Sequence, residues 1–393
     1  MKKLLILCVL VAGVAVLVWY FRTPDLPHYA PGYREYAYVT NGKSNTVSVL
    51  DLTPRPYPRF NVIRSLRVGS NPTGVTANSK KNEIYVVNTE SNNISVIDAE
   101  RNVVVATIGV HRAPYFISVS EDGQRAYVAN SGSANVSVID LQARRVLANI
   151  RVGAAPGLAQ VSPDGEIVVV SNRGDNTVSL LDARRLAVRA TIPICRQPED
   201  IAILPDSSKA FVSCSGSNQV AAVDLKYGKL LALLDVGKTP VHLQLKPDGG
   251  ELMVSNFDSD SISIIETTTN EVGGSYLIGS HPVRGVVTAD NSLLYESNFG
   301  SDAVAVYSID AGKVLGAVGV GNRPDGLALT SNQDFLLVLD TQSDDVAVIR
   351  MKRLATTSKI SADRALWAIV PVGMQPNDIA VKAFFLTEPA TRK

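Results

Sequence analysis

Short apolar runs, each followed by turn residues, succeed one another along the chain from residue 36 onward. One stretch shows four of them, over residues 116–120, 125–130, 135–140 and 146–152. Runs of this length separated by Ser, Asn, Asp and Gly predict β-strands, and the periodicity of amphipathic helices is absent. The pattern therefore predicts an all-β chain built from repeated four-stranded antiparallel sheets.

Two landmarks fix the length of the repeat. A proline recurs every 42 residues, at Pro72, Pro114, Pro156, Pro198, Pro240, Pro282 and Pro324, and once more at Pro376 after 52 residues. The end of an apolar run recurs in step with it, at Asn41, Asn88, Asn130, Asn172, Cys214, Asn256, Asn298 and Asp340. Four strands in a repeat of about 40 residues are typical of a β-propeller blade and not of a helical solenoid. We count eight blades, with seven as the alternative if the segment after Met351 lies outside the ring.

The first repeat lacks its first strand. The chain enters with predicted strands over 36–41, 46–51 and 62–68, and a surplus strand over 377–382 follows the last proline. We expect the N- and C-terminal segments to share one blade, because this pairing hides two sheet edges. The propeller domain is predicted over residues 36–393.

An uncharged stretch near the N-terminus, residues 4–20, lies between basic residues. It predicts a membrane anchor or export signal over 1–21, and cleavage stays open because Gly13 and Ala15 are small. Prolines make residues 22–35 an extended tether. We therefore expect an extracytoplasmic protein, periplasmic or at the cell surface, with the membrane as a partner, or a secreted one if the segment is cleaved.

Charge and motif content exclude several classes. With 38 Lys and Arg against 37 Asp and Glu, the net charge of +1 gives no electrostatic basis for binding nucleic acid. Hydrophobic residues make up 46% and charged residues 19%, which suits sheets with extensive buried faces. The motifs of serine hydrolases, zinc proteases, nucleotide and dinucleotide binding and covalent haem attachment are missing. No cofactor is predicted.

The repeats carry a family resemblance. They contain YVTN at 38–41, YVVN at 85–88, YVAN at 127–130 and SPDG at 162–165. These motifs resemble those of YVTN-family β-propellers, and the resemblance extends over residues 36–381. It implies a superfamily that includes surface-layer proteins, lactonase-like propellers and the haem-binding propeller of dissimilatory nitrite reductase, many of them seven-bladed. Such a resemblance is specific for fold and silent about function.

Function is expected where the repeats differ, since a position filled alike in every blade serves the common geometry. Two residues after each proline, at the predicted mouth of the central channel, the blades carry Gly74, Phe116, Leu158, Asp200, His242, Arg284, Gly326 and Asp378. Glu199 and Asp325 continue the charged arc of this ring, as a small-ligand site requires. Tyr115 and Phe116 form an apolar arc for the body of a ligand. The alternative is that the charged residues only neutralise one another around a water-filled channel.

Two chemical alternatives involve histidine. His111 replaces the glycine that most copies have three residues before the proline, and His281 directly precedes Pro282. With His242 they leave a metal or haem site open, because neutral imidazole is a common ligand. His242 with Asp200 leaves acid–base hydrolysis of a lactone open as well.

The asparagine landmarks are assigned to the scaffold, where their side chains are expected to cap the turns that follow. Acidic residues in the same loops, Asp258, Asp260, Asp302, Asp344 and Asp345, lack the spacing of known Ca²⁺ loops. We expect them to be solvated loop carboxylates.

Two departures from the repeat coincide in one blade. Cys195 stands where most copies have Gly, and Cys214 stands where six of the other seven copies have Asn. Because both positions face the same end of the propeller and the chain is predicted to be exported, we predict a disulfide. Two unpaired small residues, or a redox or metal-binding thiol pair, are the alternatives. Cys8 lies in the N-terminal segment.

These observations favour a binding or scaffolding propeller anchored outside the cytoplasm. Its loop face and channel mouth would hold a small molecule, an envelope polymer or a partner protein. A lactonase-type enzyme and a haem-handling propeller are the alternatives.

Overall fold

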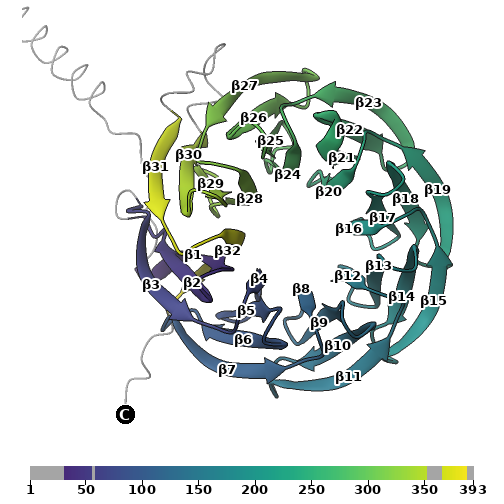
Figure 1. Ribbon diagram of the computed structural model, residues 1–393, viewed down its shortest axis with the longest axis horizontal. Helices are drawn as coiled ribbons and strands as arrows, with labels where there is room; N and C mark the ends of the chain where they lie inside the picture. The colour runs from purple at the N-terminus through teal and green to yellow at the C-terminus, as the bar shows by residue number, and fades with distance from the viewer. Residues whose placement is uncertain (1–30, 55–57, 352–364, 387–393) are drawn as a thin grey trace, which may run out of the picture.

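The computed structural model of the protein describes residues 31–54, 58–351 and 365–386. Its strands form eight four-stranded antiparallel sheets arranged around one axis (Figure 1). This confirms the predicted β-propeller of eight blades, and the alternative of seven is wrong because the chain after Met351 supplies the outer strand of the eighth blade. The predicted membrane segment, residues 1–21, lies outside the described residues, and within them no helix is long and apolar enough to span a membrane.

Every blade uses its four strands in the same order from the axis outward. The innermost strands are β4 (Pro72–Ala77), β8 (Pro114–Val119), β12 (Pro156–Val161), β16 (Pro198–Ile203), β20 (Pro240–Leu245), β24 (Pro282–Val287), β28 (Pro324–Leu329) and β32 (Pro376–Phe385). The second strands are β1 (Tyr33–Asn41), β5 (Glu83–Asn88), β9 (Arg125–Asn130), β13 (Ile167–Asn172), β17 (Lys209–Cys214), β21 (Glu251–Asn256), β25 (Leu293–Asn298) and β29 (Phe335–Asp340).

The third strands are β2 (Thr46–Asp51), β6 (Asn93–Asp98), β10 (Asn135–Asp140), β14 (Thr177–Asp182), β18 (Gln219–Asp224), β22 (Ser261–Glu266), β26 (Ala303–Ser308) and β30 (Asp345–Arg350). The outer strands are β3 (Asn61–Arg67), β7 (Val103–Gly109), β11 (Arg145–Arg151), β15 (Ala187–Pro193), β19 (Lys229–Asp235), β23 (Glu271–Leu277), β27 (Lys313–Gly319) and β31 (Leu366–Pro371). A short 3-10 turn, η1 (Phe257–Ser259), follows β21. We number the blades from blade 1, which contains β1, to blade 8, which contains β28.

Blade 1 closes the ring as predicted. Its sheet has the order β3-β2-β1-β32, and β1 pairs with β32 through contacts such as Tyr36 opposite Lys382. Both strands are longer than the sequence pattern indicated, since β1 begins at Tyr33 and β32 continues to Phe385. The first residues of β1 therefore fall inside the segment predicted as a tether.

The core lies between blades and not within them. The two middle strands of each blade are buried almost throughout, whereas the outer strands alternate between buried and exposed residues. One hydrophobic cluster joins Val169 and Leu180 of blade 4 to Val212 and Val223 of blade 5. Because each sheet packs against a neighbour on both faces, its middle strands are apolar on both faces, which explains the continuous apolar runs in the sequence.

A recurrent hydrogen bond links neighbouring blades on the loop face that carries the channel mouth. In every blade the residue four positions after the second landmark, the Asn41 position, has a left-handed backbone conformation. The φ angle is 56° at Asn45 and 54° at Asp260. Asn and Asp tolerate this conformation better than other side chains with a β-carbon. Their side-chain oxygen accepts a hydrogen bond from the backbone N–H of the residue before the next blade's proline, as Asp260 does from His281 at 2.8 Å.

The same bond occurs at seven of the eight boundaries in the described residues. The accepting residues are Asn45, Asn92, Asn176, Asn218, Asp260, Asp302 and Asp344, and the exception has Ala134 at this position. Asp260, Asp302 and Asp344 are thus structural acceptors, not merely solvated loop carboxylates as predicted.

The landmark asparagines act differently from the prediction. Instead of capping the turn, the buried amide of Asn172 donates to Thr177 Oγ1 at 3.0 Å and to Ser179 Oγ at 2.9 Å on the following strand. The glycine three residues before the proline of the same blade packs on the asparagine: a β-carbon at Gly153, before Pro156, would lie 2.7 Å from Cβ of Asn172. The asparagine side chain therefore occupies the space that a β-carbon at the glycine position would need.

The disulfide occupies this same space in blade 5. Cys195 and Cys214 are bonded, with a Cα–Cα separation of 5.7 Å, and both side chains are buried. The prediction from paired departures is confirmed. The physical reason is that the glycine position and the asparagine position touch in the other blades.

Removal of residues 376–393 should lower the melting temperature by several degrees or cause aggregation. The deletion removes β32 and so exposes the edge of β1. It also removes the contacts of β32 with β28 of blade 8 and with β4 of blade 2. Removal of residues 387–393 alone is the control, because it leaves β32 intact. Equal melting temperatures for the two truncated proteins, measured by circular dichroism, would contradict the closure.

Replacing both disulfide cysteines by serine should lower the free energy of unfolding by about 2–4 kcal/mol. A variant with Cys195→Gly, Cys214→Asn and Ala221→Ser recreates the arrangement of the other blades and should recover part of that loss through the new hydrogen bond. Urea unfolding under non-reducing conditions measures both. A serine variant as stable as the oxidised protein would show that the bond does not constrain the fold.

Candidate functional site

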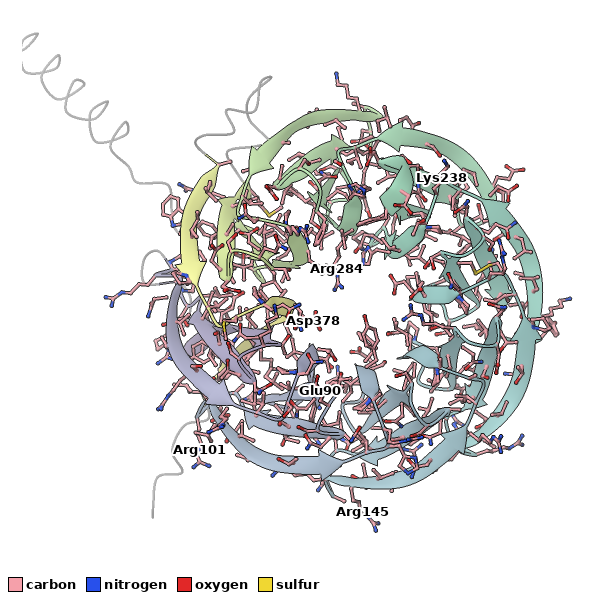
Figure 2. The ribbon with its side chains drawn as sticks, viewed as in Figure 1. Glu90, Arg101, Arg145, Lys238, Arg284 and Asp378 are labelled. Carbon is pink, nitrogen blue, oxygen red and sulfur yellow. A yellow bond between two sulfur atoms is a disulfide. The ribbon has the colours of Figure 1, made fainter. Side chains whose placement is uncertain are left out.

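The structure brings the charged ring residues together beside the axis. Asp200, His242, Arg284 and Asp378 lie on the inner strands of blades 5, 6, 7 and 1, and Asp325 lies on that of blade 8. Figure 2 shows Arg284 and Asp378 at the inner edge of the propeller, whereas Arg101 and Arg145 lie at its outer edge. Titratable groups from five consecutive blades thus line one arc.

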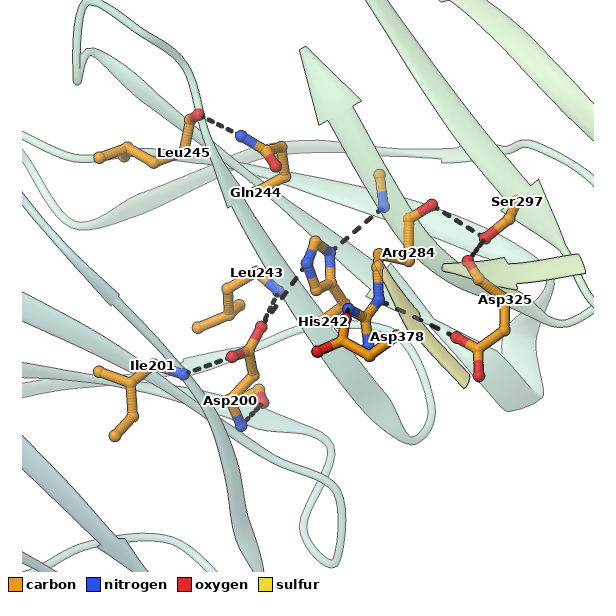
Figure 3. Close-up of polar contacts among 12 residues, drawn as sticks. Asp200, Ile201, His242, Leu243, Gln244, Leu245, Arg284, Ser297, Asp325 and Asp378 are labelled. Atoms are coloured by element: carbon orange, nitrogen blue, oxygen red, sulfur yellow. Dashed lines mark hydrogen bonds and ion pairs between the residues drawn. The ribbon is translucent and has the colours of Figure 1, made fainter. Parts of the chain in front are cut away.

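Three of these side chains hold the next blade in place. Asp200 Oδ2 accepts a hydrogen bond from the backbone N–H of Leu243 at 2.9 Å, and Asp378 Oδ2 accepts one from Val75 at 2.8 Å. His242 Nδ1 accepts one from Gly285 at 3.3 Å (Figure 3). In each pair the donor belongs to the inner strand of the next blade. Asp200, His242 and Asp378 therefore have a structural role, and it differs from the mutual neutralisation that the sequence left open.

His242 is neutral in this environment. Burial, with a further contribution from the Arg284 cation, lowers the pKa of His242 to about 3. Because Nδ1 accepts a hydrogen bond, the ring proton lies on Nε2, which is 3.9 Å from Asp200 Oδ2. Neither ring nitrogen has a lone pair free to abstract a proton.

Arg284 and Asp325 are less fully engaged. The Arg284 guanidinium lies between two carboxylates, with Nε 3.9 Å from Asp325 Oδ1 and Nη1 3.7 Å from Asp378 Oδ1 (Figure 3). These distances allow ion pairing but exceed hydrogen-bond length. Neither Arg284 Nε nor Asp325 Oδ1 has a hydrogen-bond partner in the described chain. Burial raises the pKa of Asp325, and the Arg284 charge opposes this shift.

The apolar arc faces the charged one. The Tyr115 side chain is 47% exposed, and the charges of Arg284, Arg173, Asp325 and Glu199 all act on its hydroxyl. Burial is the largest effect and raises the pKa of Tyr115. Phe116 lies beside it on β8 and is partly buried.

Arg173 lies beside the ring, in the loop after β13, and the sequence reading missed it. Its Nη2 lies 2.9 Å from Glu199 Oε1, which also accepts a hydrogen bond from Ser215. Arg173 follows landmark Asn172, where most other blades have Gly, Ser or Thr. The sequence could have indicated this residue, because a long cationic side chain stands where most blades have a small residue.

The other two histidines lie outside the ring. His111 Nδ1 is 2.6 Å from the side-chain nitrogen of Asn135, and the His281 ring makes a tilted contact with Phe257, with ring centroids 4.5 Å apart. No three His, Cys, Asp or Glu side chains of the described residues are grouped so that they could hold a metal ion.

Glu296, directly behind the ring, was also missed. It is fully buried on β25 at a position that is Val in the other seven blades, and neither carboxyl oxygen has a hydrogen-bond partner in the described part of the chain. Opposite it is Gly285, whose counterparts are mostly large aliphatic residues, and a β-carbon there would lie 2.5 Å from Glu296 Oε2. Burial raises the pKa of Glu296 to about 8, against a smaller opposing effect of the Ser255 hydroxyl. The signal was again a pair of departures in one blade.

Blade 8 contains a second buried acid. Asp340 replaces the landmark asparagine and lies opposite Asp345 in the β29–β30 pair. Burial, together with the adjacent Asp345 carboxyl, raises the pKa of Asp340. Two carboxyl groups side by side favour one shared proton, so Asp340 is neutral where six of the other seven blades have a neutral amide.

Comparisons with protein families agree with the fold. A family model for the cytochrome D1 heme domain matches residues 78–200, one for YNCE-like beta-propellers matches residues 156–317, and one for seven-bladed lactonase propellers matches residues 285–367. None covers half of the chain, and no curated protein sequence matches it. The matches confirm the chain as a repeat β-propeller of the superfamily that the YVTN-like motifs indicated.

Solved structures give the same result. Dihydro-heme d1 dehydrogenase NirN, in complex with DHE, is similar with a TM-score of 0.72 and 14% identity, over 91% of this chain and 77% of that chain. Hydrazine synthase of Kuenenia stuttgartiensis has a TM-score of 0.54 and 18% identity, over 81% and 97%. A functionally unknown protein from Desulfotomaculum acetoxidans has a TM-score of 0.58 and 18% identity, over 75% and 100%. These identities show a shared fold alone.

Glu296 should make the free energy of unfolding decrease between about pH 5 and pH 8, against an opposite contribution from His242 that ends near pH 6.5. The folded protein keeps a proton on Glu296 up to its pKa of about 8, whereas the unfolded chain loses it near the ordinary value of 4.5. Each group with a raised pKa lowers the free energy of unfolding by up to about 1.4 kcal/mol per pH unit as the pH rises through this window. The stability that its bound proton supplies at low pH is therefore lost above the folded pKa. Glu296→Gln should flatten the dependence, and Asp340→Asn should act in the same direction.

Denaturant unfolding at several pH values measures this slope. Glu121→Gln is the matched control, because the Glu121 side chain is 69% exposed. The same slope in Glu296→Gln and in the natural protein would mean that Glu296 is ionised in the folded state.

Proposed function

We propose that the protein is an extracytoplasmic propeller, held at the membrane by its N-terminal segment, that binds an amphipathic small molecule at the channel mouth. The observation that carries the proposal is the incompletely satisfied pair of Arg284 and Asp325, which faces the exposed ring of Tyr115. Convergent polar groups opposite an apolar surface are the usual composition of a small-ligand site.

The division of roles within the ring supports this site. Asp200, His242 and Asp378 are occupied by backbone N–H groups, so a ligand would meet mainly Arg284 and Asp325. Arg284 would donate to an acceptor such as a carboxylate or carbonyl, and Asp325 would accept from a hydroxyl or ammonium group. A hydroxy acid or amino acid derivative with an apolar body meets both requirements.

Binding is favoured over lactone hydrolysis by the state of His242. A general base needs a free lone pair within reach of the proton it removes. The Nδ1 lone pair of His242 is used by Gly285, and its Nε2 carries the proton. The acid–base pair that the sequence offered is therefore a poor candidate for catalysis.

The proposed location rests on two features. The N-terminal segment has the composition of an anchor or export signal, and a disulfide between Cys195 and Cys214 is expected in an oxidising compartment.

A tetrapyrrole is the second candidate ligand. The cytochrome D1 heme domain match includes Tyr115, Phe116 and Asp200, and the similar NirN structure is a complex with DHE. Arg284 and Arg173 are suited to carboxylate groups at the edge of such a ligand. His242 does not fit as an axial ligand, since Nδ1 accepts from Gly285 and Nε2 is protonated.

The test is mass spectrometry of the full-length protein purified from its native host. A small molecule should co-purify with the natural protein and be lost from Arg284→Gln, because truncating a half-buried charged donor typically weakens binding by about 2–5 kcal/mol. Arg101→Gln is the control, since Arg101 lies at the outer edge of the ring (Figure 2). A tetrapyrrole would be recognised by its visible absorption.

Retention of the same molecule by Arg284→Gln would place its binding elsewhere. A protein that carries no molecule and binds none of a panel of hydroxy acids, amino acid derivatives and tetrapyrroles would contradict the proposal.

A further inference from the structure

Blades 6 to 8 carry a cluster of ring-shaped and cationic side chains on the loop face. Phe257 and Phe299 follow the landmarks of blades 6 and 7, and His281 and Arg323 precede the prolines of blades 7 and 8. The His281 ring packs against Phe257 in a tilted arrangement with 4.5 Å between ring centroids, and the centroids of the two phenylalanine rings are 6.3 Å apart. The Arg323 guanidinium lies over Phe299, 5.1 Å from its centroid. The four side chains form one continuous layer across two blade boundaries.

This layer is a departure from the repeat. After the landmark the other blades have Gly42, Thr89, Ser131, Arg173, Ser215 and Thr341, and before the proline they have Asn71, Ala113, Ala155, Gln197, Thr239 and Gln375. None of these residues is aromatic. The fold is therefore built without aromatic side chains at these positions, so their presence in adjacent blades calls for another reason.

The layer forms part of a groove. An open depression of about 550 Å³ is lined by the four side chains together with polar groups such as Asp302, Asn322 and Gln342. Its size lies in the range of small-molecule sites. Asn322, Arg323, Asp302 and Gln342 are exposed, so their polar atoms are accessible at the edge of the aromatic surface.

We propose that this groove binds a neutral oligosaccharide. A sugar ring has an apolar C–H face that packs on aromatic rings and hydroxyl groups at its edge that bond to planar amide, carboxylate and guanidinium groups. The lining contains one guanidinium, Arg323, and one carboxylate, Asp302, so no net charge selects an acidic or a basic sugar. One face of Phe299 is already covered by the Arg323 guanidinium, and the His281 ring is tilted against Phe257, which disfavours intercalation of a flat aromatic ligand.

The groove is distinct from the channel-mouth ring. Its side chains come from the loops after β21 and β25 and before β24 and β28, whereas the ring residues lie on inner strands (Figure 1). The two proposals therefore fail independently. An open groove of this kind suits a segment of a polymer outside the cell rather than an enclosed metabolite.

The test is binding of the purified full-length protein to an array of neutral, amino and acidic oligosaccharides, followed by affinity measurement with the best soluble neutral oligosaccharide. Phe299→Thr and Arg323→Gln each introduce a residue that other blades have at the same position, so both variants should fold. Each should weaken binding by at least about tenfold, since a buried aromatic contact is lost or loosened. Gln197→Ala, at the pre-proline position of blade 5, should bind like the natural protein.

Melting curves of the same variants separate binding from packing. Loss of affinity with an unchanged melting temperature supports the groove as a glycan site. No binding to any neutral oligosaccharide, preference for acidic or amino sugars only, or equal affinity in Phe299→Thr and the natural protein would overturn the proposal. The Arg284→Gln variant should bind the oligosaccharide like the natural protein, even though it loses the co-purifying small molecule.

Discussion

The hydrogen bond between an Asn or Asp side chain on one blade and the backbone of the next sets the geometry of the whole ring. In five of its seven occurrences in the described chain the donor and acceptor are 21 residues apart. The others are 26 and 31 residues apart, in blades 1 and 8. The extra residues belong to the sequence between the third and outer strands of these blades. The hydrogen bond is therefore kept although the final proline spacing grows from 42 to 52.

Departures from the repeat come in spatially matched pairs. A glycine that packs on an asparagine is replaced together with it by the disulfide of Cys195 and Cys214. Behind the ring, Gly285 leaves the space that the carboxyl group of Glu296 fills. The first exchange strengthens the scaffold, whereas the second places an acid with unpartnered oxygens in the core. A buried polar group without a hydrogen-bond partner costs stability, and this one lies next to the candidate ligand site.

The repeat made the fold predictable from sequence. Eight landmarks define eight blades, and a missing first strand with a surplus last one defines the closure. The disulfide was predictable for the same reason, since two coinciding exceptions imply contact. The strand ends at Tyr33 and Phe385 were not, because they extend beyond the repeated segment.

The site was predictable only as a set of positions. The sequence placed Asp200, His242, Arg284 and Asp378 in one ring, and the structure brings them together. It did not show which of them bond to the next blade's backbone, because that depends on distances of a few ångströms between strands. Arg173 and Glu296 were missed because they lie at other positions of the repeat. His111 and His281 share the loop face, but each contacts a residue of another loop, Asn135 and Phe257 respectively, instead of reaching the channel mouth.

The central claim is that the repeat supplies the scaffold while departures near the ring serve function at the expense of stability. Calorimetric melting of the double variant Gly285→Leu with Glu296→Val tests it most directly, because it gives blade 7 the residues of blade 8 at Leu327 and Val338 and leaves Arg284 intact. The account predicts a melting temperature above that of the natural protein at neutral pH, since a buried acid is exchanged for matched apolar packing. A lower melting temperature would show that Gly285 and Glu296 are themselves part of the scaffold and would contradict the claim.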